Sequence, residues 1–135
     1  GDDAAGRRVL ETALDRNPTD AGVSHSLGLL LIRAGHTDSA LNFLERAARQ
    51  EPGTARYAYV YAAALHSLGR SQEAGRAANQ ALADHPFEAD LLELLVTLGL
   101  ESGDGEQALH AVRRLRELFP DREDYRAIER DLLGP

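Results

Sequence analysis

The chain has 135 residues, enough for one domain with a continuous hydrophobic core. Its formal net charge is −7, which argues against a general role in nucleic-acid binding, because phosphate recognition needs a net basic face. The absence of cysteine excludes disulfides, thiolate catalysis and Cys-His haem attachment within this chain.

The first predicted element lies within residues 1–20 and has the apolar spacing of a helix. Leu10, Ala13 and Leu14 share one face of that helix, and Pro18 follows where a helix has to stop. In the repeat described below, this phase belongs to the second helix of a unit. We therefore expect the array to start halfway through a unit, as a fragment of a longer protein.

Residues 21–54 are predicted to form a complete pair of helices, over Ala21–Arg33 and Asp38–Gln50. Gly35 lies between them, where the chain has to reverse, and glycine adopts a left-handed conformation there without a steric penalty. Thr37 offers a hydroxyl group that we expect to cap the second helix.

The same pattern recurs in residues 55–88 and 89–122, because small residues and prolines keep a period of 34 along the whole chain. A fixed period of this length indicates a structural repeat. Ser71 and Asp104 are the predicted caps of the later second helices. The alanines are expected where paired helices approach closely. The periodic residues are Pro18, Pro52, Pro86 and Pro120; Gly35, Gly69 and Gly103; Ala40, Ala74 and Ala108; and Ala13, Ala47 and Ala81.

A last helix is predicted after Pro120, between Asp121 and Leu133. We expect residues 123–135 to cap the array and to shield the open apolar edge of the last unit. The apolar residues predicted to share one face of this helix are Tyr125, Ile128, Leu132 and Leu133.

The repeat resembles the tetratricopeptide repeat, a family of 34-residue helix–turn–helix units. The Leu-Gly pair of that family stands at Leu27 and Gly28, and its glycine, alanines and proline coincide with the periodic residues given above. The resemblance covers nearly the entire chain as a single domain. It implies an all-α fold, a right-handed α-α superhelix of helix–turn–helix units with a C-terminal capping helix.

The chain departs from the family pattern inside several predicted helices. An aromatic residue near the start of each first helix is replaced by Ser24, Ala58 and Leu92. Gly99 stands where an aromatic usually packs, and Gly75 lies inside a second helix. A glycine in a helix costs roughly 1 kcal/mol relative to alanine, so we expect both turns to be locally soft.

In this family the first helix of each unit lines a concave groove, and the resemblance implies which residues face it. These residues change from basic and aromatic in the first two units to acidic in the third. They are His25, Leu29, Ile32 and Arg33; Arg56, Tyr59, Ala63 and His66; and Asp90, Glu93, Thr97 and Glu101.

Such a groove would hold an extended peptide or a helix. We expect a carboxylate near Arg33 and Arg56, and a basic group near Glu93 and Glu101. Tyr59 is the predicted anchor, since tyrosine combines a large rigid area with a hydroxyl group. The alternative for each residue is an ordinary position that faces solvent.

One specialised binding mode of the family is excluded by the same positions. The clamp that holds the C-terminal carboxylate of chaperone tails uses lysine, asparagine and further basic residues along the groove. The corresponding places here hold His25, Leu29, Val60, Asp90 and Leu94. Asp90 would repel the carboxylate, so we do not expect a chaperone-tail adaptor.

Residue types that carry catalysis or bind metals form no recognisable motif. The segment Gly103-Asp104-Gly105 joins two predicted helices and does not follow a strand, which excludes a phosphate loop of the usual kind. The five histidines lack the spacing of a helical zinc site. We therefore expect no enzyme, no catalytic residue, no metal and no cofactor. The histidines are His25, His36, His66, His85 and His110.

Two functions from different classes remain open. The first is a protein–protein interaction module, part of a larger bacterial protein, that binds a peptide or partner protein in the groove. The second is a structural or self-association spacer. Residues 55–70 resemble the repeat region of some bacterial multi-haem cytochrome-type proteins, which would make the chain a spacer domain of an exported protein.

The expected partner is a protein or peptide. No nucleic acid is expected because of the net charge of −7, and no membrane is expected because no apolar run of about 18 residues occurs. The expected state is a monomer or a weak dimer through the exposed ends of the array. The sequence does not distinguish the cytoplasm from the periplasm.

Overall fold

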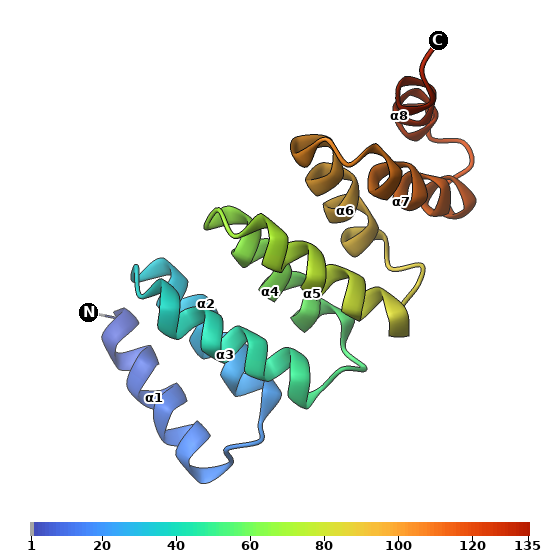
Figure 1. The fold of residues 1–135 in the computed structure, drawn as a ribbon. Coiled ribbons are helices and arrows are strands. Elements are labelled where there is room, and N and C mark those ends of the chain that lie inside the picture. The colour runs from blue at the N-terminus through green and yellow to red at the C-terminus, as the bar shows by residue number, and fades with distance from the viewer. Residues whose placement is uncertain (1) are drawn as a thin grey trace.

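The computed structural model describes residues 2–135, which form eight helices and no strand (Figure 1). The helices are α1 (Asp2–Arg16), α2 (Ala21–Arg33), α3 (Thr37–Gln50), α4 (Ala55–Ser67), α5 (Ser71–Asp84), α6 (Ala89–Ser102), α7 (Gly105–Leu118) and α8 (Glu123–Leu133). None of the helices within residues 2–135 has the length and apolar character to cross a bilayer.

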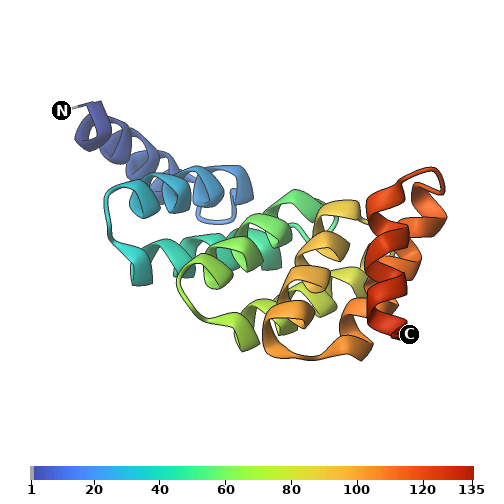
Figure 2. The same cartoon turned by 90° about the horizontal axis from the view of Figure 1, so that it is seen from above.

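The helices stack in two layers (Figures 1 and 2). We call α2, α4 and α6 the first-helix layer, and α3, α5 and α7 the second-helix layer. Each first helix packs against the second helix of its own unit, and that helix contacts the first helix of the next unit. Contacts therefore lie almost entirely between neighbours in sequence, which is the arrangement of a solenoid. The predicted fold class, an all-α superhelix of helix–turn–helix units, is confirmed.

The turns within the three units are built as predicted. Gly35, Gly69 and Gly103 have φ angles of 83°, 80° and 78°, in the left-handed region that favours glycine. Each of them lies in the short connection after the first helix of its unit, where the chain reverses within two or three residues. The prolines lie in the connections between units, two positions after the last residue of the preceding helix.

The predicted caps are only partly correct. In each unit the N-cap is the residue directly after the turn glycine, and only Asp104 has a capping side chain there. Its carboxylate accepts a hydrogen bond from the Gln107 amide at 3.1 Å. Thr37 and Ser71 already lie inside helices α3 and α5, so their prediction as caps was wrong. A capping side chain works from a non-helical residue, and these two residues stand one position too late.

The close packing of paired helices rests on small residues. The periodic alanines Ala40, Ala74 and Ala108 are fully buried, as expected. Gly99 also belongs to this set, because an added Cβ would lie 2.8 Å from the Asp104 carbonyl oxygen. It is therefore a point of tight helix contact, whereas Gly75 has open space around it.

Helix α8 covers the last unit with only part of its predicted face. Tyr125 is buried, and Ile128 and Leu132 are half-buried against the core. Leu133 is 58% exposed, so its placement on the buried face was wrong. A residue eight positions after Tyr125 is rotated by about 80° from it around an α-helix, and this places Leu133 at the edge of the contact.

Candidate partner-binding surface

All twelve predicted groove residues lie on the first-helix layer. Most of the charged ones are exposed, while the aromatic rings are half-buried. The exposed residues are Leu29, Arg33, Arg56, Asp90, Glu93, Thr97 and Glu101, and the half-buried residues are His25, Ile32, Tyr59, Ala63 and His66. The structure thus divides the predicted set into exposed side chains and side chains that neighbouring residues partly cover.

Helices α2 and α4, which form the N-terminal part of the first-helix layer, carry the basic residues of the predicted set. Arg56 forms no ion pair within residues 2–135, and Arg33 reaches Asp3 only at 3.9 Å, between two largely exposed side chains. Exposed pairs of this kind contribute little to stability, so both guanidinium groups remain available. Leu29 is 41% exposed and adds an apolar contact on α2. This end therefore offers two positive charges together with an aliphatic side chain.

His25 joins α2 to α4 and does not face solvent freely. Its ring centroid lies 4.7 Å from that of Tyr57, with the two planes tilted by 38°. Burial, and then the positive charge of Arg56, lower the pKa of His25 below its usual value. The neutral ring is therefore favoured, and the positive charge at this end comes from the arginines.

The three tyrosines of α4 face different surroundings. Tyr57 lies against His25, and Tyr59 packs against the hydrophobic core. The Tyr61 hydroxyl donates a hydrogen bond to Glu45 of α3 at 3.0 Å. Burial, followed by this hydrogen bond, raises the pKa of Tyr61 to about 12. Tyr59, the predicted anchor, is thus already partly used in packing, and its removal would affect stability as well as binding.

The acidic end of the layer is largely engaged within the fold. Glu101 lies 2.7 Å from His66 Nε2, which links α6 to α4. Glu93 accepts a hydrogen bond from the Tyr125 hydroxyl of α8. Burial of Tyr125, and then this hydrogen bond, raise its pKa to about 12. The two carboxylates predicted to contact a basic group of a partner therefore hold neighbouring helices together.

Tyr57 and Tyr125 make contacts that the sequence did not predict. They occupy the same place in their units, two periods apart, and each contacts the first-helix residue that precedes it by 32 positions, His25 and Glu93 respectively. The period of 34 would have aligned the two tyrosines. It would not have shown that their partners lie in the preceding unit.

Within residues 2–135, the side chains that usually bind metals form no group of three or more. The surface carries charge at one end, an exposed aliphatic side chain beside it, and internal contacts at the other end.

Stacked helical hairpins whose contacts lie almost entirely between neighbours define the class of α-solenoids, which present extended surfaces for binding. Within this class, residues 1–64 match the family model described as Tetratricopeptide repeat. The recognition of tetratricopeptide repeats is confirmed for these residues. No curated protein matches the sequence.

The fold is shared with several solved bacterial structures. A crystal structure of MamA superposes with a TM-score of 0.76 at 19% identity, covering 91% of this chain and 72% of that chain. MamA from Desulfovibrio magneticus RS-1 superposes with a TM-score of 0.73 at 18% identity, covering 93% of this chain and 71% of that chain. PilF of Pseudomonas aeruginosa superposes with a TM-score of 0.76 at 21% identity, covering 98% of this chain and 61% of that chain. At these identities the similarity establishes the fold. The narrower resemblance to multi-haem cytochrome-type proteins finds no support in these matches.

Proposed function

We propose that the chain is a protein-interaction module whose first-helix layer binds an acidic peptide segment of a partner protein. The observation that carries this proposal is the α2–α4 end of the layer. Arg33 and Arg56 are exposed there without a strong ion pair, and Leu29 lies on the same layer. Arg33 is the last residue of α2 and Arg56 lies in the first turn of α4, so separate carboxylates of the peptide would contact the two guanidinium groups, and an apolar side chain would contact Leu29.

The engaged acidic end restricts where the peptide binds. Glu93 and Glu101 already hold Tyr125 and His66, so a basic group of the partner would have to displace these contacts. The Arg33 and Arg56 end offers its charges without such a cost. The expected specificity is therefore for acidic segments, with most of the discrimination at α2 and α4.

A displayed peptide library tests this proposal directly. Selection on the wild-type chain is expected to enrich acidic segments, whose affinity is then measured by fluorescence anisotropy. Arg56→Glu is expected to weaken binding at least tenfold. Arg8→Glu on α1 is the matched control, because it makes the same charge change at an exposed residue outside the layer. Equal losses in both variants would show a general charge effect and contradict a site on this layer.

A second candidate function is self-association through the ends of the array. Val9 on α1 is 68% exposed and Leu133 on α8 is 58% exposed, so each terminal helix shows an apolar side chain to solvent. Sedimentation equilibrium tests this candidate: a dimer that Val9→Asp dissociates and Arg56→Glu leaves intact would support it. A monomer at high concentration would contradict it.

A further inference from the structure

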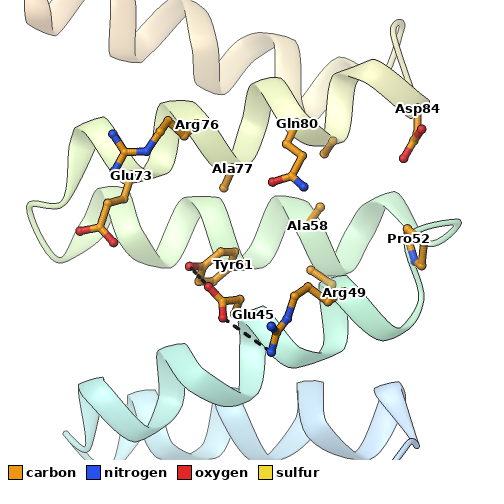
Figure 3. Close-up of a pocket in the computed structure, with 12 residues that line it drawn as sticks. Glu45, Arg49, Pro52, Ala58, Tyr61, Glu73, Arg76, Ala77, Gln80 and Asp84 are labelled. Atoms are coloured by element: carbon orange, nitrogen blue, oxygen red, sulfur yellow. Dashed lines mark hydrogen bonds and ion pairs between the residues drawn. The ribbon is translucent and has the colours of Figure 1, made fainter.

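Clefts recur on the side of the molecule formed by the second-helix layer. The cleft between α3 and α5 has α4 as its floor and a volume of 430 Å³ (Figure 3). The clefts between α1 and α3 and between α5 and α7 have volumes of 250 Å³ and 400 Å³. Because the three lie at corresponding places in successive units, a comparison of the units shows which residues shape each cleft.

An arginine crosses between units at the first and third of these places. Arg46 donates a hydrogen bond to the carbonyl oxygen of Pro18 at 2.7 Å. Arg114, two periods later, donates to the carbonyl oxygen of Pro86 at 3.3 Å. In both units a long side chain thus reaches from a second helix to the preceding proline turn.

The middle unit lacks this bridge. Gln80 stands one period after the first of those arginines, and it makes no side-chain hydrogen bond within residues 2–135. The carbonyl oxygen of Pro52 is contacted instead by His85 Nε2, at 2.8 Å. The amide of Gln80 is directed into the space between α5 and α4 (Figure 3). The cleft consequently extends along α5 as far as the Pro52 turn.

The floor of the cleft is also short of side-chain volume. Ala58 lies there, at the place where the repeat pattern has a large aromatic residue and where the third unit has the buried Leu92. The wall formed by α5 presents Ala77 and Ala81. Small residues on the floor and on one wall leave a space that a large flat side chain can enter, and its volume lies within the range of ligand-binding clefts.

The rim of the cleft carries polar groups suited to an indole. Arg76 and Asp84 lie toward opposite ends of α5, and neither forms an ion pair within residues 2–135 (Figure 3). Arg49 lies on the opposite wall, 3.8 Å from Glu45. A guanidinium group is attracted to the face of an aromatic ring, most strongly to tryptophan. The Asp84 carboxylate and the Gln80 amide oxygen can accept the indole N–H, which needs a partner when buried.

We propose that the cleft between α3, α4 and α5 is a second docking site, which takes a tryptophan side chain presented by a protein partner. This cleft opens on the side of the second-helix layer and shares none of the twelve predicted groove residues, so the proposal stands whether or not the groove binds a peptide. Tryptophan is among the residues that most often dominate the energetics of protein interfaces.

The chain contains no tryptophan, which provides a direct readout. The probe is N-acetyltryptophanamide, excited at the red edge of its absorption, where tyrosine does not absorb. Titration with the chain is expected to shift its emission to the blue and to saturate with a dissociation constant on the order of 1 mM, as for a small fragment. Amide chemical-shift changes in the chain are expected to concentrate in α3, α4 and α5.

Variants copied from the other units of this chain provide the test. Ala58→Leu combined with Gln80→Arg restores the residues found in the third unit, and it is expected to weaken probe binding at least tenfold. Arg76→Gln, at the exposed rim, provides a second variant that need not disturb packing, and it is expected to weaken binding about threefold by loss of the cation–π contact. Leu29→Ala on the first-helix layer is expected to leave probe binding unchanged.

Three results would overturn the proposal. One is the absence of a saturable blue shift with the wild-type chain. Another is unchanged binding in both the double variant and Arg76→Gln. The third is equal competition by N-acetylleucinamide, which would assign the cleft to an aliphatic side chain and contradict recognition of an indole.

Discussion

The contrast between Gly99 and Gly75 gives the sharpest test of how the helices pack. Both glycines lie inside helices, so replacement by alanine gains about 1 kcal/mol of helix propensity at each. At Gly99 the new Cβ would lie 2.8 Å from the Asp104 carbonyl oxygen and 2.9 Å from the Ala108 amide nitrogen. At Gly75 nothing lies within 4 Å of the new Cβ.

The expected magnitudes follow from these distances. An ordinary contact begins near 3.4 Å, so α7 has to move away from α6 by about 0.6 Å in Gly99→Ala. Backbone atoms cannot rotate aside as a side chain does, and overpacking of this kind costs about 1–3 kcal/mol. The net effect is a destabilisation of up to about 2 kcal/mol for Gly99→Ala, against a gain of about 1 kcal/mol for Gly75→Ala.

Urea unfolding of the two variants and the wild type, followed by far-ultraviolet circular dichroism, measures this difference. Because the propensity terms cancel, the gap between the two variants reports the strain alone, about 1–3 kcal/mol. For a chain of this length, 2 kcal/mol corresponds to roughly 7 °C in Tm. A Gly99→Ala variant as stable as Gly75→Ala would refute the conclusion that α6 and α7 touch through their backbones at this point.

Three further outcomes follow from the same contacts. Asp104→Ala is expected to lower stability by about 1 kcal/mol, because the hydrogen bond to the Gln107 amide is lost, whereas Thr37→Ala, which removes no cap, is expected to stay within about 0.5 kcal/mol of wild type in urea unfolding. Stability is expected to fall as the pH drops below 6.5, since the unfolded chain then binds a proton more readily than the folded chain does at His25, whose pKa is lowered; an unchanged pH profile in His25→Asn would contradict this. In an alkaline titration followed by phenolate absorbance, Tyr125→Phe is expected to remove a component near pH 12. The stability of the wild type is expected to decline above pH 10, because the tyrosine ionises first in the unfolded chain.

Much of the fold was predictable from local and repeated features. Glycine at the turns and proline between the units act on the backbone of their own neighbourhood, and the 34-residue period repeats that information along the chain. Alanine in the paired helices marks where they meet. These signals were sufficient to predict the two-helix units and the stacked architecture.

The caps show where local reasoning fails by a single residue. The sequence offers a hydroxyl at Thr37 and Ser71, and only the backbone conformation shows that both stand inside their helices. Gly99 shows the same limit for packing. Its cost to helix propensity is visible in the sequence, whereas its contact with the backbone of α7 depends on how two helices cross.

The candidate sites were decided mainly by the tertiary structure. The sequence determined which side chains lie on the first helices, and hence the change from basic to acidic along them. Only the stacking of the units showed that Glu93 and Glu101 are engaged by Tyr125 and His66, while Arg56 is free of such contacts within residues 2–135. Which charges remain available depends on the neighbouring unit, since the contacts of Glu93 and Glu101 join residues that the chain places more than thirty positions apart. The cleft beside Gln80 has the same origin, because a missing side chain becomes a cavity only when the helices around it are in place.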